Sequence, residues 1–105
     1  MSEQEKILKG IIEKIIKAVQ PKKIILFGSY ASGTPTSHSD MDILIVKSTK
    51  KLRWERELFL SKILYPPPLP IDHIWRTPRE LEQRMKRGDL FYKEILERGK
   101  VVYEA

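Results

Sequence analysis

The sequence contains no cysteine. This absence excludes disulfide bonds, iron–sulfur clusters and zinc sites built from thiolates. The two histidines, His38 and His73, are far apart in the sequence, so they do not form a zinc-binding motif. A zinc site is therefore not expected.

Long apolar runs are also lacking. The longest, at residues 24–27 and 43–46, are far too short to cross a bilayer. The N-terminal segment MSEQEKILKG is not followed by the apolar stretch of a signal peptide. We therefore expect a cytoplasmic protein that does not bind membranes.

The chain has 105 residues and a formal net charge of +6. This length suits a single domain, which we place at residues 1–105. The positive charge indicates either a solvated surface or attraction to an anion such as a nucleotide, RNA or an acidic partner. Lysine and arginine do not form a block with interleaved aromatic residues, so direct nucleic-acid binding is not expected.

Helical and extended patterns alternate along the chain. A first helix is predicted from Ile7, Ile11 and Ile15, which recur every four residues, and Pro21 ends it. Further helices are expected at 51–64, 77–88 and 89–99, and strands at 23–27, 41–46, 70–75 and 100–103. Residues 30–39 form a connection that starts with a helical turn, and the proline-rich segment 65–70 forms another. This order predicts an α/β fold with helices packed on a small sheet.

The segment 51–64 fits an amphipathic helix whose apolar side carries Trp54, Leu58, Phe59 and Ile63. Leu81 and Met85 of the next helix are expected to face inward, and the helix after it carries Phe91, Ile95 and Leu96. A tryptophan could instead stack against a nucleotide base, but core packing or a partner interface is the simpler interpretation of Trp54 and Trp75.

Two aspartates, Asp40 and Asp42, stand at the start of an apolar strand. Side chains two residues apart in a strand point to the same face, so the two carboxylates share one patch. At about 5 Å and an effective dielectric of 20 they would repel by about 3 kcal/mol. A divalent cation relieves that repulsion, and oxygen ligands without Cys or His favour Mg²⁺ or Mn²⁺. A solvated turn or a helix cap is the alternative for each aspartate alone.

The dipeptide Gly28-Ser29 follows a strand that is predicted to be buried. Glycine lets the backbone approach a ligand closely, and a helical turn after it would direct N–H groups and the Ser29 hydroxyl at a phosphate. Ser39, next to Asp40, either bonds a phosphate or shapes the turn. A nucleoside triphosphate bound with Mg²⁺ needs both a phosphate site and a carboxylate pair.

A third carboxylate, Asp72, lies within an apolar strand. An unpaired buried carboxylate is costly, so Asp72 is expected to have a partner. If its strand lies beside Met41–Val46, Asp72 joins the Asp40/Asp42 patch. As an alternative, Asp72 lies on an edge strand and pairs with Arg76 or a lysine.

These motifs together resemble a known family. Gly28-Ser29, ten further residues and then Asp40-x-Asp42 resemble the signature of the polymerase-β-like nucleotidyltransferases. The surrounding FGSYASG and SDMDILIV are similar to the minimal nucleotidyltransferase (MNT) branch. The resemblance covers nearly the whole chain and implies a small mixed β-sheet with helices packed against it.

By position, the resemblance implies the roles of the site residues. Asp40 and Asp42 match the carboxylates that bind two metal ions, and Asp72 matches the third catalytic carboxylate. Gly28 and Ser29 match the residues that contact the triphosphate. Family members usually transfer AMP from ATP, and small MNT proteins are commonly antitoxins that modify a tyrosine of a HEPN toxin.

Two alternative functions stay open: AMP transfer to a small molecule, and neutralisation of a toxin by binding without catalysis. The catalytic parts occupy most of the 105 residues, which leaves little room for a domain that holds the acceptor. We therefore expect the acceptor side to come from a second copy of the chain or from a HEPN partner.

Overall fold

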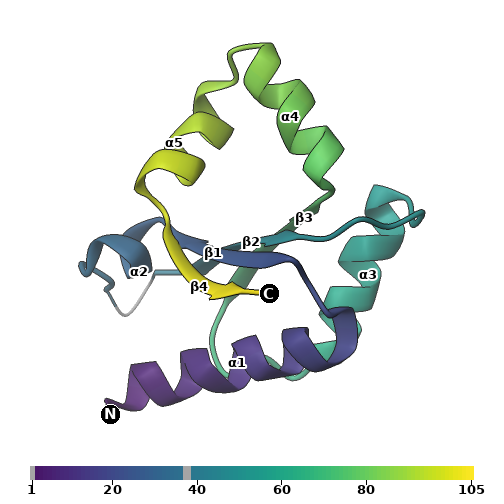
Figure 1. Ribbon diagram of the computed structural model, residues 1–105. Coiled ribbons are helices and arrows are strands. Elements are labelled where there is room, and N and C mark those ends of the chain that lie inside the picture. The colour runs from purple at the N-terminus through teal and green to yellow at the C-terminus, as the bar shows by residue number, and fades with distance from the viewer. Residues whose placement is uncertain (1, 37–38) are drawn as a thin grey trace.

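The computed structural model describes residues 2–36 and 39–105, so His38 lies outside the described residues. The elements are α1 (Glu3–Val19), β1 (Lys23–Phe27), α2 (Ser29–Ser32), β2 (Met41–Val46), α3 (Arg53–Ile63), β3 (Ile71–Arg76), α4 (Pro78–Lys86), α5 (Leu90–Arg98) and β4 (Lys100–Glu104) (Figure 1). Their order confirms the α/β prediction, including the helical turn after the first strand.

The strands form one four-stranded sheet with the order β3-β2-β1-β4. Strand β1 is antiparallel to both β2 and β4, whereas β2 and β3 are parallel. The sheet is therefore mixed, as expected. Helix α3 forms the crossover that a parallel pair requires.

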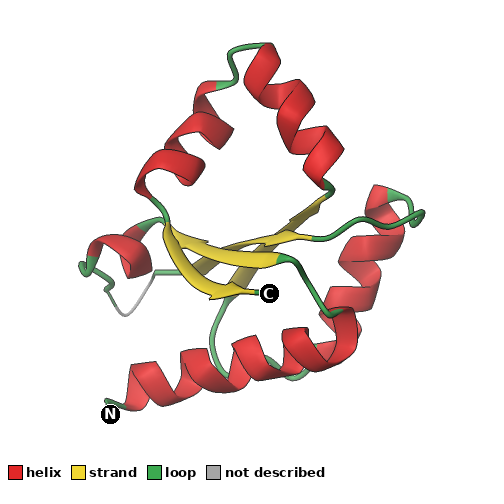
Figure 2. Ribbon diagram, viewed as in Figure 1, coloured by secondary structure: helices red, strands yellow, loops and turns green. Residues whose placement is uncertain are grey.

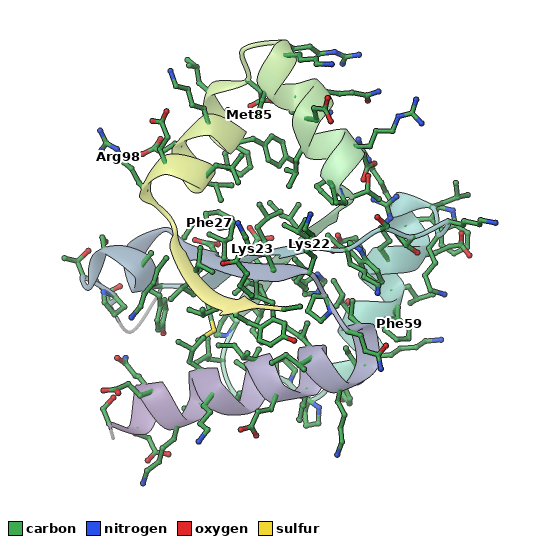
Figure 3. All side chains as sticks on the ribbon, in the orientation of Figure 1. Lys22, Lys23, Phe27, Phe59, Met85 and Arg98 are labelled. Atoms are coloured by element: carbon green, nitrogen blue, oxygen red, sulfur yellow. The ribbon has the colours of Figure 1, made fainter. Side chains whose placement is uncertain are left out.

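Helices cover both faces of the sheet. Helices α1 and α3 lie on one side, and α4 and α5 lie on the other (Figure 2). Each face has its own core, and the labelled Phe59 and Phe27 lie on opposite sides (Figure 3). The α1/α3 core includes Ile11, Ile15, Ile24, Leu26, Ile43, Ile45, Leu60 and Trp75, and the α4/α5 core includes Ile25, Leu44, Val46, Leu81, Tyr92 and Ile95. Because β2 is covered on both faces, its residues after Asp42 are all apolar.

The helix ends follow the predicted capping signals. The Ser2 hydroxyl accepts a hydrogen bond from the Glu5 N–H at 3.1 Å and caps α1. Thr77 and Glu80 form a reciprocal capping box at the start of α4. Asp89 caps α5 by accepting from two backbone N–H groups. These local signals fix where the helices begin.

The prediction that Trp54 and Leu58 face the core is wrong. Trp54 is 65% exposed and Leu58 is 47% exposed. Helix α3 packs through Leu60, with Phe59 partly buried beside it, so residues 54 and 58 project to the outside. For Trp54 the interpretation as core therefore fails, and a partner interface and base stacking are the alternatives left.

The inward assignment of Met85 on α4 is also wrong, since Met85 is 38% exposed. Phe91 and Leu96 on α5 are 51% and 39% exposed, respectively. The two helices form a hairpin whose turn points away from the sheet (Figure 1). Only one side of each helix can reach the sheet, where Leu81 and Ile95 are buried.

Within residues 2–36 and 39–105, none of the helices combines the length and the apolar character that crossing a membrane requires.

Candidate active site

Asp42 and Asp72 lie directly opposite each other on neighbouring parallel strands. The predicted pairing of the third strand with Met41–Val46 is thus confirmed. Side chains alternate along a strand, and Leu44 on β2 packs in the α4/α5 core with Ile74 of β3 packed against it. Asp42 and Asp72 therefore project from this same face of the sheet.

Asp72 is exposed, which corrects the expectation of a buried carboxylate that needs a partner. The physical reason is that β3 is an edge strand. The alternative pairing with Arg76 does not occur either, since the Arg76 guanidinium donates to the Tyr92 hydroxyl at 2.9 Å and to a backbone carbonyl. Asp72 is open to solvent and to an approaching molecule.

Asp40 is exposed and precedes β2 by one residue. Its charge reaches Asp42: burial, then the charge of Asp72 and then that of Asp40 raise the pKa of Asp42 above its ordinary value. The three carboxylates are therefore close enough to repel one another. In residues 2–36 and 39–105, however, no group of three His, Cys, Asp or Glu side chains is already arranged around a common ion position.

Gly28 contacts the Asp42 side chain across the β1–β2 pair. Its φ of 73° and ψ of −154° belong to a backbone region that is open almost only to glycine. A Cβ added to Gly28 would collide with Oδ2 of Asp42 and would lie 3.3 Å from Cγ. The missing side chain therefore creates the space in which the Asp42 carboxylate lies.

Ser29 begins the short helix α2 directly after Gly28. The backbone N–H groups of Ala31 and Ser32 both donate to the Gly28 carbonyl, at 3.1 and 3.2 Å, and hold this turn against the end of β1. Ser29 is partly buried. The turn thus begins at Gly28, which lies against the Asp42 carboxylate, and no described contact joins Ser29 itself to Asp42.

Ser39 shapes the loop that leads to Asp40. Its hydroxyl accepts a hydrogen bond from the Thr36 N–H at 2.8 Å and lies 3.2 Å from the Thr36 hydroxyl. The Ser39 N–H donates to the Thr36 carbonyl at 3.1 Å. These contacts favour the turn interpretation of Ser39 over a phosphate contact.

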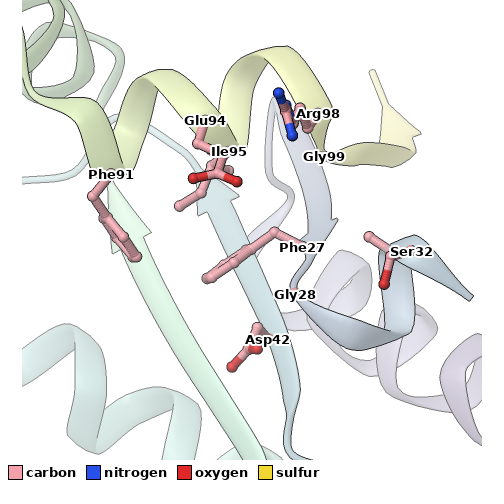
Figure 4. Close-up of a pocket in the computed structure, with 10 residues that line it drawn as sticks. Phe27, Gly28, Ser32, Asp42, Phe91, Glu94, Ile95, Arg98 and Gly99 are labelled. Atoms are coloured by element: carbon pink, nitrogen blue, oxygen red, sulfur yellow. The ribbon is translucent and has the colours of Figure 1, made fainter. Parts of the chain in front are cut away.

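A cavity of about 510 Å³ opens beside Asp42, within the usual range for ligand pockets (Figure 4). Its described lining comes from β1, α2, β2, α5 and the turn after α5: Phe27, Gly28, Ala31, Ser32, Asp42, Phe91, Glu94, Ile95, Arg98 and Gly99. The sequence alone predicts no site role for the α5 residues. Their spacing at 91, 94, 95 and 98 marks one helix face, but nothing in the sequence shows that this face lies over the site.

The remaining candidates have structural partners. The Trp75 indole is buried in the core and donates to the Lys47 carbonyl at 3.0 Å, so the core interpretation holds for it. His73 follows Asp72 in β3 and so points to the opposite face of the sheet, where its Nδ1 lies 2.6 Å from Glu57 on α3. Arg53 lies 3.5 Å from a Glu80 carboxylate oxygen. No described contact of these residues reaches the aspartates.

Comparisons with known proteins agree with this geometry. A protein family described as "Nucleotidyltransferase domain" matches residues 7–102. Two Methanocaldococcus jannaschii proteins named as candidate protein adenylyltransferases are similar in sequence. MJ1305 is 32% identical over 95% of this chain and 74% of its own length. MJ0604 is 36% identical over 78% of this chain and 78% of its own length.

Solved structures share the fold. A candidate nucleotidyltransferase from Sulfolobus solfataricus superposes with a TM-score of 0.63 at 20% identity, over 94% of this chain and 78% of that one. A toxin–antitoxin complex with AMP-PNP superposes with a TM-score of 0.53 at 24% identity, over 92% of this chain and 73% of the matched chain. A mutant of the toxin–antitoxin MntA–HpeT superposes with a TM-score of 0.54 at 23% identity, over 93% of this chain and 72% of the matched chain.

Proposed function

Since this chain belongs to the nucleotidyltransferase domain family, we propose that it transfers AMP from ATP to a hydroxyl group of a partner protein. The proposed cofactor is a pair of divalent ions, Mg²⁺ or alternatively Mn²⁺. The proposed partner is a HEPN toxin, with a tyrosine as the acceptor, so the chain would act as an antitoxin.

One observation carries this proposal. Asp42 and Asp72 face each other across β2 and β3, and Gly28 leaves room for the Asp42 carboxylate. Asp40 adds a third negative charge close enough to raise the pKa of Asp42. The charges of Asp72 and Asp40 near Asp42, which lines a cavity, are unfavourable without a cation, and this supports a metal-binding role.

The chemistry of the donor set fits a hard divalent ion. Asp40, Asp42 and Asp72 offer carboxylate oxygens, the ligands that Mg²⁺ and Mn²⁺ prefer. The three would hold the ions after side-chain rotation, because they are not yet arranged around one position. Bound ions would neutralise the triphosphate and stabilise the attacking and leaving oxygens.

The exposed Asp72 has a further role in the proposal. The acceptor oxygen forms a bond to the α-phosphorus of ATP, the bond from that phosphorus to the pyrophosphate oxygen breaks, and Asp72 takes the hydroxyl proton. Its position on the edge strand supports this role, because an acceptor on another protein can reach it there.

Gly28 and Ser29 are proposed to bind the triphosphate. Support comes from the α2 turn, which begins at Gly28 against the Asp42 carboxylate, and from the family signature at these positions. Because the toxin–antitoxin neighbour was solved with AMP-PNP, an ATP analogue, a bound adenine nucleotide is compatible with this fold.

The test uses the full chain, a purified HEPN protein as the candidate partner, ATP labelled at the α-phosphate, and Mg²⁺. The label is expected on a tyrosine of the partner, located by mass spectrometry. Asp42→Asn should abolish the labelling. Asp89→Asn is the matched control, because asparagine caps a helix as well as aspartate does, and it should retain the labelling.

The outcomes separate the three functions. If Asp42→Asn loses both labelling and neutralisation of the toxin, the adenylyltransferase proposal stands. Lost labelling with full neutralisation would mean an antitoxin that acts by binding. Label on a small molecule but never on the partner would favour a small-molecule transferase.

A further inference from the structure

The cavity beside Asp42 extends to only one side of the proposed reaction centre. Asp42 and Gly28 form one end of its lining, and the face of α5 forms the other (Figure 4). Asp72 does not belong to the described lining, and it lies on β3, on the side of β2 away from β1. The two sides of Asp42 therefore differ: one is a pocket and the other is an open sheet edge.

The pocket side has aromatic walls. The Phe27 and Phe91 rings meet edge to face, with centroids 5.9 Å apart. Phe91 is nevertheless 51% exposed, which is unusual for an aromatic side chain that lines a cavity. A partly exposed aromatic ring offers a surface on which a planar base can stack.

Two charged side chains, Glu94 and Arg98, line the same cavity from the next turns of α5. Neither side chain makes an ion pair or hydrogen bond within residues 2–36 and 39–105. A carboxylate accepts hydrogen bonds from an exocyclic amino group, and a guanidinium donates to ring nitrogens or to a carbonyl oxygen. A purine presents both kinds of group on its edges.

From this arrangement we infer that the α5 face of Phe91, Glu94 and Arg98 binds the purine base of the donor nucleotide. The inference rests on the proposed function and deepens it. The triphosphate lies at Gly28 and Asp42, the base lies against α5, and the acceptor approaches from the open side of Asp72. The cavity of about 510 Å³ is large enough for a nucleotide rather than a phosphate alone.

The test compares two probes on the full chain by calorimetric titration with Mg²⁺: ATP and inorganic tripolyphosphate, which lacks the base. Wild-type protein should bind ATP more tightly than tripolyphosphate. Phe91→Ala should weaken ATP binding about 5- to 150-fold, the range for losing one base–aromatic stack, and should leave tripolyphosphate binding unchanged.

Leu96→Ala is the matched control. Leu96 is on the same helix and 39% exposed, and it is not among the residues that line the cavity. This variant should bind both probes as the wild type does. Thermal melts of all variants check that they are folded.

A second variant tests the base edge without removing an aromatic ring. Combined Glu94→Ala and Arg98→Ala substitutions should lower the preference for ATP over UTP several-fold, because the groups that recognise the purine edge are gone. Both side chains are exposed, so the fold should persist.

The results distinguish this inference from the proposed function. If the wild type binds neither probe, both are overturned. If it binds both probes equally well, or if Phe91→Ala weakens both to the same degree or neither, the base site is overturned while the metal–triphosphate site stands. An unchanged ATP-to-UTP ratio in the double variant overturns edge recognition by Glu94 and Arg98.

Discussion

Gly28 is under two separate steric constraints. It combines a backbone conformation that is nearly reserved for glycine with the contact to Asp42. Gly33 also has a positive φ, of 79°, but a Cβ added there would meet nothing within 4 Å. A comparison of substitutions at the two glycines therefore distinguishes the effect of backbone strain from that of crowding the Asp42 carboxylate.

Gly28→Ala is expected to abolish nucleotide transfer and to lower the free energy of unfolding by about 1–3 kcal/mol, the cost of the strained backbone. The new methyl group displaces the Asp42 carboxylate. Gly33→Ala should cost about 1 kcal/mol and retain most of the transfer activity. Urea unfolding and labelled-ATP assays measure both effects. Equal activity losses in the two variants would contradict the contact argument.

Asp42 is expected to favour function at the expense of stability. Without metal, its charge faces those of Asp40 and Asp72, and this repulsion acts only in the folded state. Asp42→Asn should therefore raise the metal-free free energy of unfolding by about 0.5 kcal/mol, a small value because the site is solvent-screened.

Magnesium is expected to reverse this difference in stability between the wild type and Asp42→Asn. Added Mg²⁺ should raise the melting temperature of the wild type, because an ion that binds only the folded state stabilises it. The Asp42→Asn variant should show little or no rise, and chelation with EDTA should remove the wild-type rise. A thermal-shift titration measures this. Equal Mg²⁺ responses in both proteins would argue against these ligands.

At the scale of elements, one buried arginine joins α3, β3 and α4. Arg56 is 6% exposed, and its guanidinium donates to the backbone carbonyls of Lys51 and Trp75. It also donates to Glu80 at 2.7 Å, the residue that completes the capping box of α4. This single side chain fixes the C-terminal end of the strand that carries Asp72.

Arg56→Met should lower the free energy of unfolding by about 2–4 kcal/mol, because it removes the buried guanidinium that donates to the partly buried Glu80 carboxylate and to the Lys51 and Trp75 carbonyls. Arg53→Ala, which removes an exposed contact to the same carboxylate, should cost less than about 1 kcal/mol. Denaturant unfolding of both variants measures the difference. Similar costs would mean that burial of the ion pair is unimportant.

The pH dependence of stability follows from Glu80. Burial alone would raise its pKa, but hydrogen bonds from Thr77 and the hydrogen bond and charge of Arg56 together lower it below 4.5. A lowered pKa in the folded state gives stability that is present above the ordinary pKa and lost as the pH falls through the lowered one. The stability difference between wild type and Arg56→Met should therefore shrink below about pH 4.5.

At the scale of the whole molecule, the donor and acceptor sides have different shapes. The cavity beside Asp42 can enclose a nucleotide, whereas Asp72 on the edge strand is open. A catalyst must hold the attacking hydroxyl within reach of the α-phosphorus, and an open edge does not do this by itself. A protein partner would supply the missing orientation.

The chain alone should therefore label free tyrosine or small hydroxyl compounds at a rate on the order of 100-fold or more below that for the partner protein. Labelled-ATP assays with each acceptor at equal concentration measure the ratio. Fast transfer to a free small molecule would show that the acceptor needs no second protein.

The sequence by itself determined the element order, the helix caps and the aspartate motif. Those features depend on residues close together in the chain: Ser2 with Glu5, Thr77 with Glu80, and the two-residue spacing of Asp40 and Asp42. Local spacing dictates local geometry, so such features can be read directly.

Only the tertiary structure decided which surfaces meet. Asp72 proved to be exposed because β3 is an edge strand, and Trp54 because α3 packs through Leu60. The α5 face that lines the cavity depends on how the α4–α5 hairpin lies over the sheet. Strand order and helix packing bring together residues that are distant in the chain. The sequence does not show whether an apolar side chain lies in a core or lines a pocket, because this depends on those distant neighbours.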